Sequence, residues 1–201
     1  MATLLLPPTR LERWVENFGS RHGETALKVV GGALAGAAGD GSTFTARLPF
    51  ATSYDGEPEV AAFVSAVEVP ASWGVLLVRK GGFAIARLER ATMLEHKIGQ
   101  RHVQGRTKAG GQSQQRFARR RDNQARQAYE AAAEHAARIL TGVPLAVAGG
   151  DHPAVDEVLA DRRLGRLAVV GPWLPVPDPK RVVLDQAIVD AAAITIEVTN
   201  A

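Results

Sequence analysis

The chain has 201 residues, of which 46% are hydrophobic, and a formal net charge of +3. This length suits one large domain, or one domain with a small companion, and is ample for a hydrophobic core. The sequence contains no cysteine, which excludes disulfide bonds, thiolate metal sites and a nucleophilic thiol. Its five histidines are scattered, and none forms a pair at metal-ligand spacing, so we expect neither a metal nor another cofactor.

The sequence also predicts a protein without a membrane partner. No apolar run approaches the roughly 18 residues that a membrane helix needs. The opening stretch MATLLLPPTR is too short and too uncharged to be a secretory signal. We therefore expect a cytoplasmic protein.

Residues 1–70 are expected to form a small α+β extension. Residues 8–23 place apolar side chains at helical spacing, with Thr9 as a candidate N-cap and Gly19 or Gly23 as the end. Residues 25–30 and 42–50 have the composition of strands. The Gly/Ala-rich segment 31–41 between them fits neither G-x-G-x-x-G nor the P-loop pattern, which favours a loose hairpin connection. Residues 57–69 predict a short helix that ends at Pro70.

Residues 71–201 are expected to form the larger domain. Residues 73–89 predict a β-hairpin and residues 92–103 a third strand. A long alanine-rich helix should begin near Ser113 and end at Gly142. After it come a strand (143–149), a helix (152–163) with Asp151 available as its cap, a strand (165–173), a helix (178–193) and a last strand (194–198). This alternation predicts an α/β fold with a mixed sheet flanked by helices.

Positive charge is concentrated between residues 97 and 126. This segment holds nine basic residues and a single acid, Asp122, and therefore carries +8 while the rest of the chain carries −5. The basic residues are Lys97, Arg101, Arg106, Lys108, Arg116, Arg119, Arg120, Arg121 and Arg126. A mildly acidic body with one cationic segment indicates a localised polyanion site. The alternative, a solvated helix face, is weaker because such faces intersperse acids among the bases.

Two glycines and a neutral amide lie inside this cationic segment. Gly110 and Gly111 permit backbone angles closed to other residues and let the main chain approach a ligand closely. Arginines in the first turns of the following helix oppose its dipole by about 0.3–1 kcal/mol each, a cost that bound phosphates would offset. Gln112 offers two donors and one acceptor without titrating, which suits the positioning of a water or a sugar hydroxyl. These residues favour nucleic-acid binding over a solvated loop and leave catalysis open.

The sequence GGQSQQRFARRR, residues 110–121, resembles the catalytic loop and following helix of the class 1 translation release factors of eukaryotes and archaea. Those proteins carry Gly-Gly-Gln, then Ser, then Arg-Phe-Ala-Arg at the same spacing. The matching positions here are Gly110, Gly111, Gln112, Ser113, Arg116, Phe117, Ala118 and Arg119. The hairpin upstream and the strand at 145–151 also look like that catalytic domain, so the resemblance extends from about residue 72 to the C-terminus.

The chain has no room for the codon-reading domain or the GTPase-binding domain of those factors. It is more similar to the stand-alone, Vms-like release-factor family, which has bacterial members and is associated with freeing nascent chains from stalled large subunits. That family carries Gly-x-x-Gln, a spacing that Gly111 and Gln114 also satisfy. Gln112 and Gln114 are thus both candidates, and the Arg-Phe-Ala-Arg register favours Gln112.

The resemblance implies a peptidyl-tRNA hydrolase that acts in the peptidyl-transferase centre of the large ribosomal subunit, independently of stop codons. Gln112 would orient the attacking water, and its backbone N–H would face the oxyanion. The tRNA and rRNA phosphates would be held by the surrounding cations Arg106, Lys108, Arg116, Arg119, Arg120 and Arg121, while Phe117 and Tyr129 anchor the helix. Two alternatives remain: cleavage near the CCA end of the tRNA, and non-catalytic binding to RNA or ribosomes. His102 and His135 are each alone and are expected to be polar surface residues or partners of backbone groups.

Overall fold

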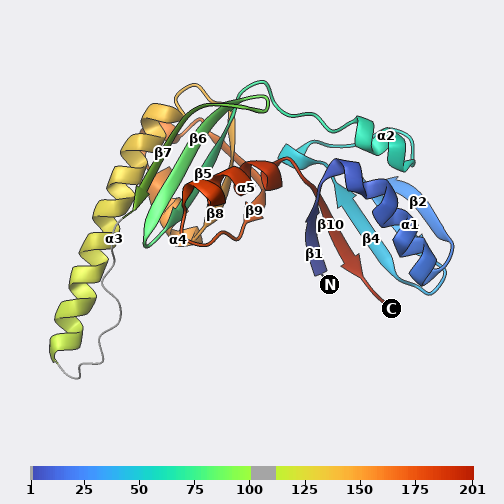
Figure 1. Cartoon of the computed structure of the whole chain (residues 1–201), viewed down its shortest axis with the longest axis horizontal. Coiled ribbons are helices and arrows are strands. Elements are labelled where there is room, and N and C mark those ends of the chain that lie inside the picture. The colour runs from blue at the N-terminus through green and yellow to red at the C-terminus, as the bar shows by residue number, and fades with distance from the viewer. Residues whose placement is uncertain (1, 101–111) are drawn as a thin grey trace. The chain divides into compact units, whose positions relative to one another are not determined.

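This computed structural model describes the backbone of residues 2–100 and 112–201, with side chains for residues 2–100 and 126–201 (Figure 1). The chain divides into two compact units, one formed by Met1–Pro70 with Ile188–Ala201 and the other by Ala71–Ala187. The sequence had placed residues 71–201 in one domain. The structure differs at the C-terminal end, because the last strand pairs with strands of the N-terminal unit.

The first unit is built on a five-stranded antiparallel sheet with the strand order β1-β10-β4-β3-β2. In that order the strands are Ala2–Leu6, Ile194–Thr199, Thr43–Arg47, Ala33–Ala38 and Thr25–Val30. Helices α1 (Leu11–His22) and α2 (Val60–Ser65) contribute Leu11, Phe18 and Phe63 to the same buried cluster as Phe44 and Ile196 of the sheet. The two helices therefore cover one face of this sheet.

Two expectations for this unit were wrong. The segment predicted as a hairpin connection contains β3, which pairs with β2 and with β4. Its Gly36 faces the Phe44 ring so closely that an added Cβ would lie 2.1 Å from a ring carbon, so the strand needs its small residues. Thr9 does not cap α1, because a 3-10 turn over Pro8–Arg10 precedes the helix. The end of the helix is as expected, since Gly23, at φ 96°, is one of the two predicted end positions.

The second unit contains a mixed five-stranded sheet with the order β7-β6-β5-β8-β9. Its strands are Thr92–Gln100, Gly82–Glu89, Trp73–Arg79, Leu145–Gly150 and Ala168–Leu174 in that order. The β5-β6-β7 meander is antiparallel, whereas β5, β8 and β9 run parallel, which confirms the predicted hairpin and the predicted mixed α/β class.

Three helices accompany this sheet: α3 (Gln112–Ile139), α4 (His152–Leu159) and α5 (Arg181–Ala191). The core of the unit joins Leu76 and Ile85 of the sheet to Ala136 and Ile139 of α3 and to Val158 of α4. None of the helices in the described part of the chain could span a membrane.

Candidate functional site

The segment that contains the candidate glycines and glutamines follows β7, on the side of the second unit's sheet where β5, β7 and β8 all end. β7 ends at Gln100, which pairs with Gly82, and Gly82 in turn pairs with Arg79 at the end of β5. Val78 pairs with Gly150 in the parallel ladder, so β8 ends on the same side of the sheet as β5 and β7. Residues 101–111 follow Gln100 in the chain, and helix α3 then leads back to the sheet.

The C-terminal half of α3 is fixed to the sheet by small and aromatic side chains. Tyr129 is 9% exposed, and Ala132, Ala136 and Ile139 are fully buried. Their spacing of three and four residues forms one face of the helix. Burial raises the pKa of the Tyr129 phenol, and the nearby carboxylates of Asp151 and Glu157 raise it further. The predicted anchoring role of Tyr129 is confirmed, whereas the Phe117 side chain lies outside the described residues.

Ion pairs surround this anchored half. Arg138 bonds to Glu95 of β7, and Arg163 Nη2 lies 2.8 Å from Glu134. Arg163 also chelates Asp161 and, by its side chain and then its backbone N–H, lowers the Asp161 pKa to about 2. All of these groups except the half-buried Glu95 and Asp161 are exposed, so the pairs contribute only modestly to stability.

The N-terminal half of α3 extends beyond the sheet (Figure 1). The helix has 28 residues, which at 1.5 Å per residue makes it about 42 Å long. Gln112 is its first residue, and Ala128 is the first of its described side chains to be buried. These two positions are separated by about 24 Å along the axis. The first turn contains no acidic residue, and its free N–H groups form the positive end of the helix dipole.

The predicted site residues divide into two sets. Arg106, Lys108, Gly110 and Gly111 lie outside the described residues, as does His102. The other candidates occupy backbone positions on α3, and their side chains are outside the described part. They are Gln112, Gln114, Arg116, Arg119, Arg120 and Arg121.

Helical periodicity separates the two candidate glutamines. At about 100° per residue, positions 112, 116 and 119 fall within about 60° of one another around the axis. Position 114 lies about 200° from position 112, on the side of the helix that also carries Tyr129 and Ala132. Position 112 thus shares a helix face with Arg116 and Arg119, opposite the buried face.

A pocket of about 340 Å³ lies between α3 and the β6-β7 hairpin, with Phe83, Lys97, Gln100, Ala128 and His135 among its lining residues. His135 is half-buried, and its ring lies 5.7 Å from the Phe83 ring, which corrects the expectation of a surface histidine. Burial lowers the His135 pKa, and Lys97 and Arg138 add to this effect. Ala128, Ala131 and His135 place this pocket against the C-terminal half of α3.

Asp151 occupies the N-cap position of α4 but makes no capping bond with its side chain. Its carboxylate instead accepts the Lys80 N–H at 3.3 Å and lies 3.5 Å from Arg79 Nε. The expectation of a capping bond was therefore wrong, and Asp151 instead links β8 to the β5-β6 turn.

The next residue, His152, stacks on Trp173 at 3.6 Å between ring centroids, a contact that no sequence pattern indicated. Within the described residues, no cluster of three or more His, Asp or Glu side chains is arranged to hold a metal.

The structure thus defines a mixed α/β protein with two sheets flanked by helices and a long helix that extends from one of them. A family model described as Actinobacteria/chloroflexi VLRF1 release factor matches residues 71–197. The chain belongs to this release-factor family. No curated protein sequence matches the chain.

Three solved structures are similar to the chain at low identity. One is described as the Vms1 mitochondrial localization core, with 13% identity, a TM-score of 0.44 and coverage of 93% of this chain and 80% of that chain. The archaeal translation termination factor aRF1 has 12% identity, a TM-score of 0.36 and coverage of 94% and 65%. Archaeoglobus fulgidus Pelota has 11% identity, a TM-score of 0.25 and coverage of 94% and 62%.

Proposed function

We propose that the protein is a peptidyl-tRNA hydrolase that frees nascent peptides from tRNA on stalled ribosomes or large subunits, without the need for a stop codon. The observation that carries this proposal is the position of the family motif in the fold. Gln112, which follows Gly110 and Gly111 in the sequence, is the first residue of a long helix, and the other end of that helix packs against a sheet in a chain of a release-factor family. We further propose that it acts in the cytoplasm.

A helix that is anchored at one end supports this proposal, because it can carry the Gln112 amide at its other end into a narrow site walled by RNA. Hydrolysis of the ester requires a water aligned on the carbonyl carbon and donors for the developing oxyanion. In this proposal the Gln112 side chain aligns the water and its backbone N–H faces the oxyanion. The leaving group is a ribose hydroxyl whose neighbouring hydroxyl shares the proton, so the protein need not supply a strong base.

The face arrangement on α3 supports Gln112 over Gln114 as the catalytic glutamine. Position 112 is on the same face as two of the arginines that we assign to phosphate binding, and position 114 is on the face that continues into the buried anchor. Arg106, Lys108, Arg116, Arg119, Arg120 and Arg121 would hold RNA phosphates around the tip. Such contacts weaken as salt displaces the protein from the phosphates.

The proposal is tested with radiolabelled peptidyl-tRNA on isolated large subunits. Gln112→Ala should lower the release rate at least about 100-fold, because the attacking water is no longer aligned and misplacement by about 1 Å can cost that much, and should leave ribosome association within about twofold. Gln114→Ala is the matched control and should release at close to the wild-type rate. Release that persists in both variants would refute the catalytic assignment and leave a ribosome-binding role.

The size of the released tRNA separates ester hydrolysis from cleavage of the RNA. Hydrolysis leaves the CCA end intact, whereas endonucleolytic cleavage shortens the tRNA. The same assay with free peptidyl-tRNA identifies the substrate form, since a protein that needs the ribosome should act slowly on the free molecule.

Phosphate binding has its own test. Arg119→Glu/Arg120→Glu should weaken ribosome association most strongly at low salt. The control Arg162→Glu/Arg166→Glu makes the same change in net charge at exposed positions of the same unit, outside α3. Equal weakening by both pairs would mean that overall charge, and not the helix, governs binding.

A further inference from the structure

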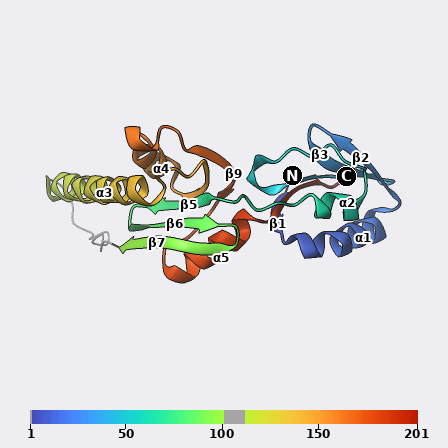
Figure 2. The same ribbon diagram turned by 90° about the horizontal axis from the view of Figure 1, so that it is seen from above.

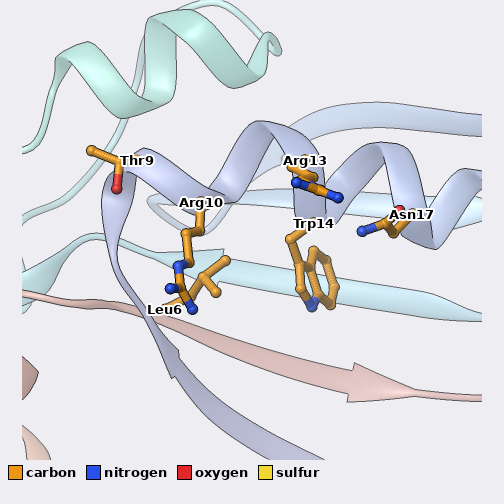
Figure 3. Close-up of a pocket in the computed structure, with 6 residues that line it drawn as sticks. All are labelled: Leu6, Thr9, Arg10, Arg13, Trp14 and Asn17. Atoms are coloured by element: carbon orange, nitrogen blue, oxygen red, sulfur yellow. The ribbon is translucent and has the colours of Figure 1, made fainter.

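The first unit contains a pocket that the release-factor motif does not involve. It has a volume of about 480 Å³ and is lined by Leu6, Thr9, Arg10, Arg13, Trp14 and Asn17. Figure 3 shows Arg10 extended beside Leu6 and the Trp14 ring directed from α1 toward the sheet, with Arg13 and Asn17 along the helix. All six residues belong to the start of the chain, between the end of β1 and the second turn of α1.

The charges of this pocket are unbalanced. Arg10 and Arg13 are exposed, and within the described part of the chain neither guanidinium has a hydrogen-bond or ion-pair partner. No carboxylate lines the pocket. The unit as a whole holds five basic and ten acidic residues, so two unpaired guanidinium groups at one pocket are a local exception. Such a site favours an anionic ligand.

The aromatic ring in the pocket is held in one orientation. Trp14 stacks on Phe18 at 5.6 Å and meets the Phe44 ring edge-on at 5.2 Å. These contacts use part of the indole, and the residue remains half-buried. The free part of the ring and the Leu6 side chain give the pocket an apolar lining, while the Asn17 amide and the Thr9 hydroxyl supply neutral donors and acceptors.

We propose that this pocket binds single-stranded RNA, with one base against Trp14 and Leu6 and the adjacent phosphates on Arg10 and Arg13. Guanidinium groups match phosphate oxygens in geometry and charge, and the free part of the Trp14 indole offers a stacking surface for a base. A volume of about 480 Å³ is in the range of small-ligand sites and is large enough for a nucleotide. A flat base covers the free part of the indole face more fully than an aspartate or glutamate side chain does, which favours RNA over an acidic peptide.

The test uses the full-length protein and a fluorescein-labelled ten-nucleotide oligouridylate, whose binding is followed by anisotropy over a range of KCl concentrations. Each phosphate contact to a single strand contributes about 0.7 to the slope of log affinity against log salt. Arg10→Ala/Arg13→Ala should therefore reduce that slope by about 1.4. The control Arg21→Ala/Lys28→Ala removes the same charge from exposed positions of the same unit outside the pocket and should leave the slope nearly unchanged.

Trp14 provides a second readout. Unlabelled oligouridylate should quench the tryptophan fluorescence of the wild-type protein, and Trp14→Phe, which keeps an aromatic ring against Phe18 and Phe44, should lose that part of the quench. Equal slopes for the two double variants, or a full quench in Trp14→Phe, would overturn the proposal. So would decaglutamate binding that is as tight as RNA binding and is lost in Arg10→Ala/Arg13→Ala. None of these measurements needs ribosomes or peptide release, so they succeed or fail independently of the proposed hydrolase activity.

Discussion

The length of helix α3 is the structural quantity on which the proposed activity depends, and it can be changed without changing the site or its anchor. Insertion of seven alanines between Asn123 and Gln124 adds residues between Gln112 and the first described buried side chain, Ala128. Seven residues add about 10.5 Å of helix and turn it by about 700°, only about 20° short of two full turns. Gln112 therefore moves outward along the helix axis and keeps nearly the same direction around it.

Misplacement of a catalytic group by only about 1 Å can cost roughly 100-fold in rate. We therefore expect the insertion to lower peptide release on large subunits at least about 100-fold. The buried contacts of Tyr129, Ala132 and Ile139 lie outside the insertion, and alanine has the highest helix propensity, so the melting temperature should be unchanged. All nine cations of the basic segment remain, and ribosome association should stay within about threefold of wild type.

A control of unchanged length separates reach from composition. Asn123→Ala/Gln124→Ala alters the same place in the helix without moving Gln112 and should release peptide at close to the wild-type rate. Circular dichroism checks that the inserted residues are helical. If the longer helix forms and release continues within threefold of wild type, then Gln112 is not delivered by a helix of fixed length, and the reasoning from the anchored base fails.

Three further predictions concern stability and are measured by urea or thermal unfolding. Ile139→Ala should cost about 2–5 kcal/mol, because it opens a cavity under α3, whereas Val182→Ala, at a side chain that is 78% exposed, should have little effect. Gly36→Ala should destabilise the first unit by about 1–3 kcal/mol, since its Cβ would press on the Phe44 ring; a neutral result would mean that the strand has room to shift. The lowered pKa of His135 means that the unfolded chain binds its proton more readily, so this residue should lower stability as the pH falls below about 6.5. His135→Gln should therefore lose less stability than wild type between pH 7.5 and 5.5, and an equal loss would contradict this reasoning.

Elements whose signals are local could be predicted from the sequence. The β5-β6 hairpin follows from two apolar runs around the turn at Lys80 and Gly81, and the packing of α3 follows from its alanines and Tyr129. The segment that forms β3 was missed because alanine and glycine have low strand propensity. Its conformation is imposed from outside, by hydrogen bonding to β2 on one side and β4 on the other.

Around the candidate site, too, the contacts that the sequence could not predict are those between residues far apart in the chain. The bond between Arg163 and Glu134 and the stacking of His152 on Trp173 each join residues that no periodic pattern relates. The candidate glutamines and arginines could be identified from the sequence because they lie close together in one short segment. The assignment of position 112 to the arginine face needed only the helical period together with a known buried face.

The position of β10 shows that the N-terminal unit is needed to complete the segment that the family model matches. The match to the release-factor family extends to residue 197, and therefore includes most of β10 (Ile194–Thr199). β10 lies between β1 and β4, and its Ile194 and Ile196 are fully buried in the core of the first unit. A fragment that begins at residue 71 would keep this strand but lose both of its neighbours, leaving two buried isoleucines and two rows of backbone hydrogen-bonding groups without partners. In this chain, the segment matched by the family model thus needs β1 and β4, from the first 47 residues, to complete its last strand, so the first unit is required for the folding of that segment as well as for the proposed RNA pocket.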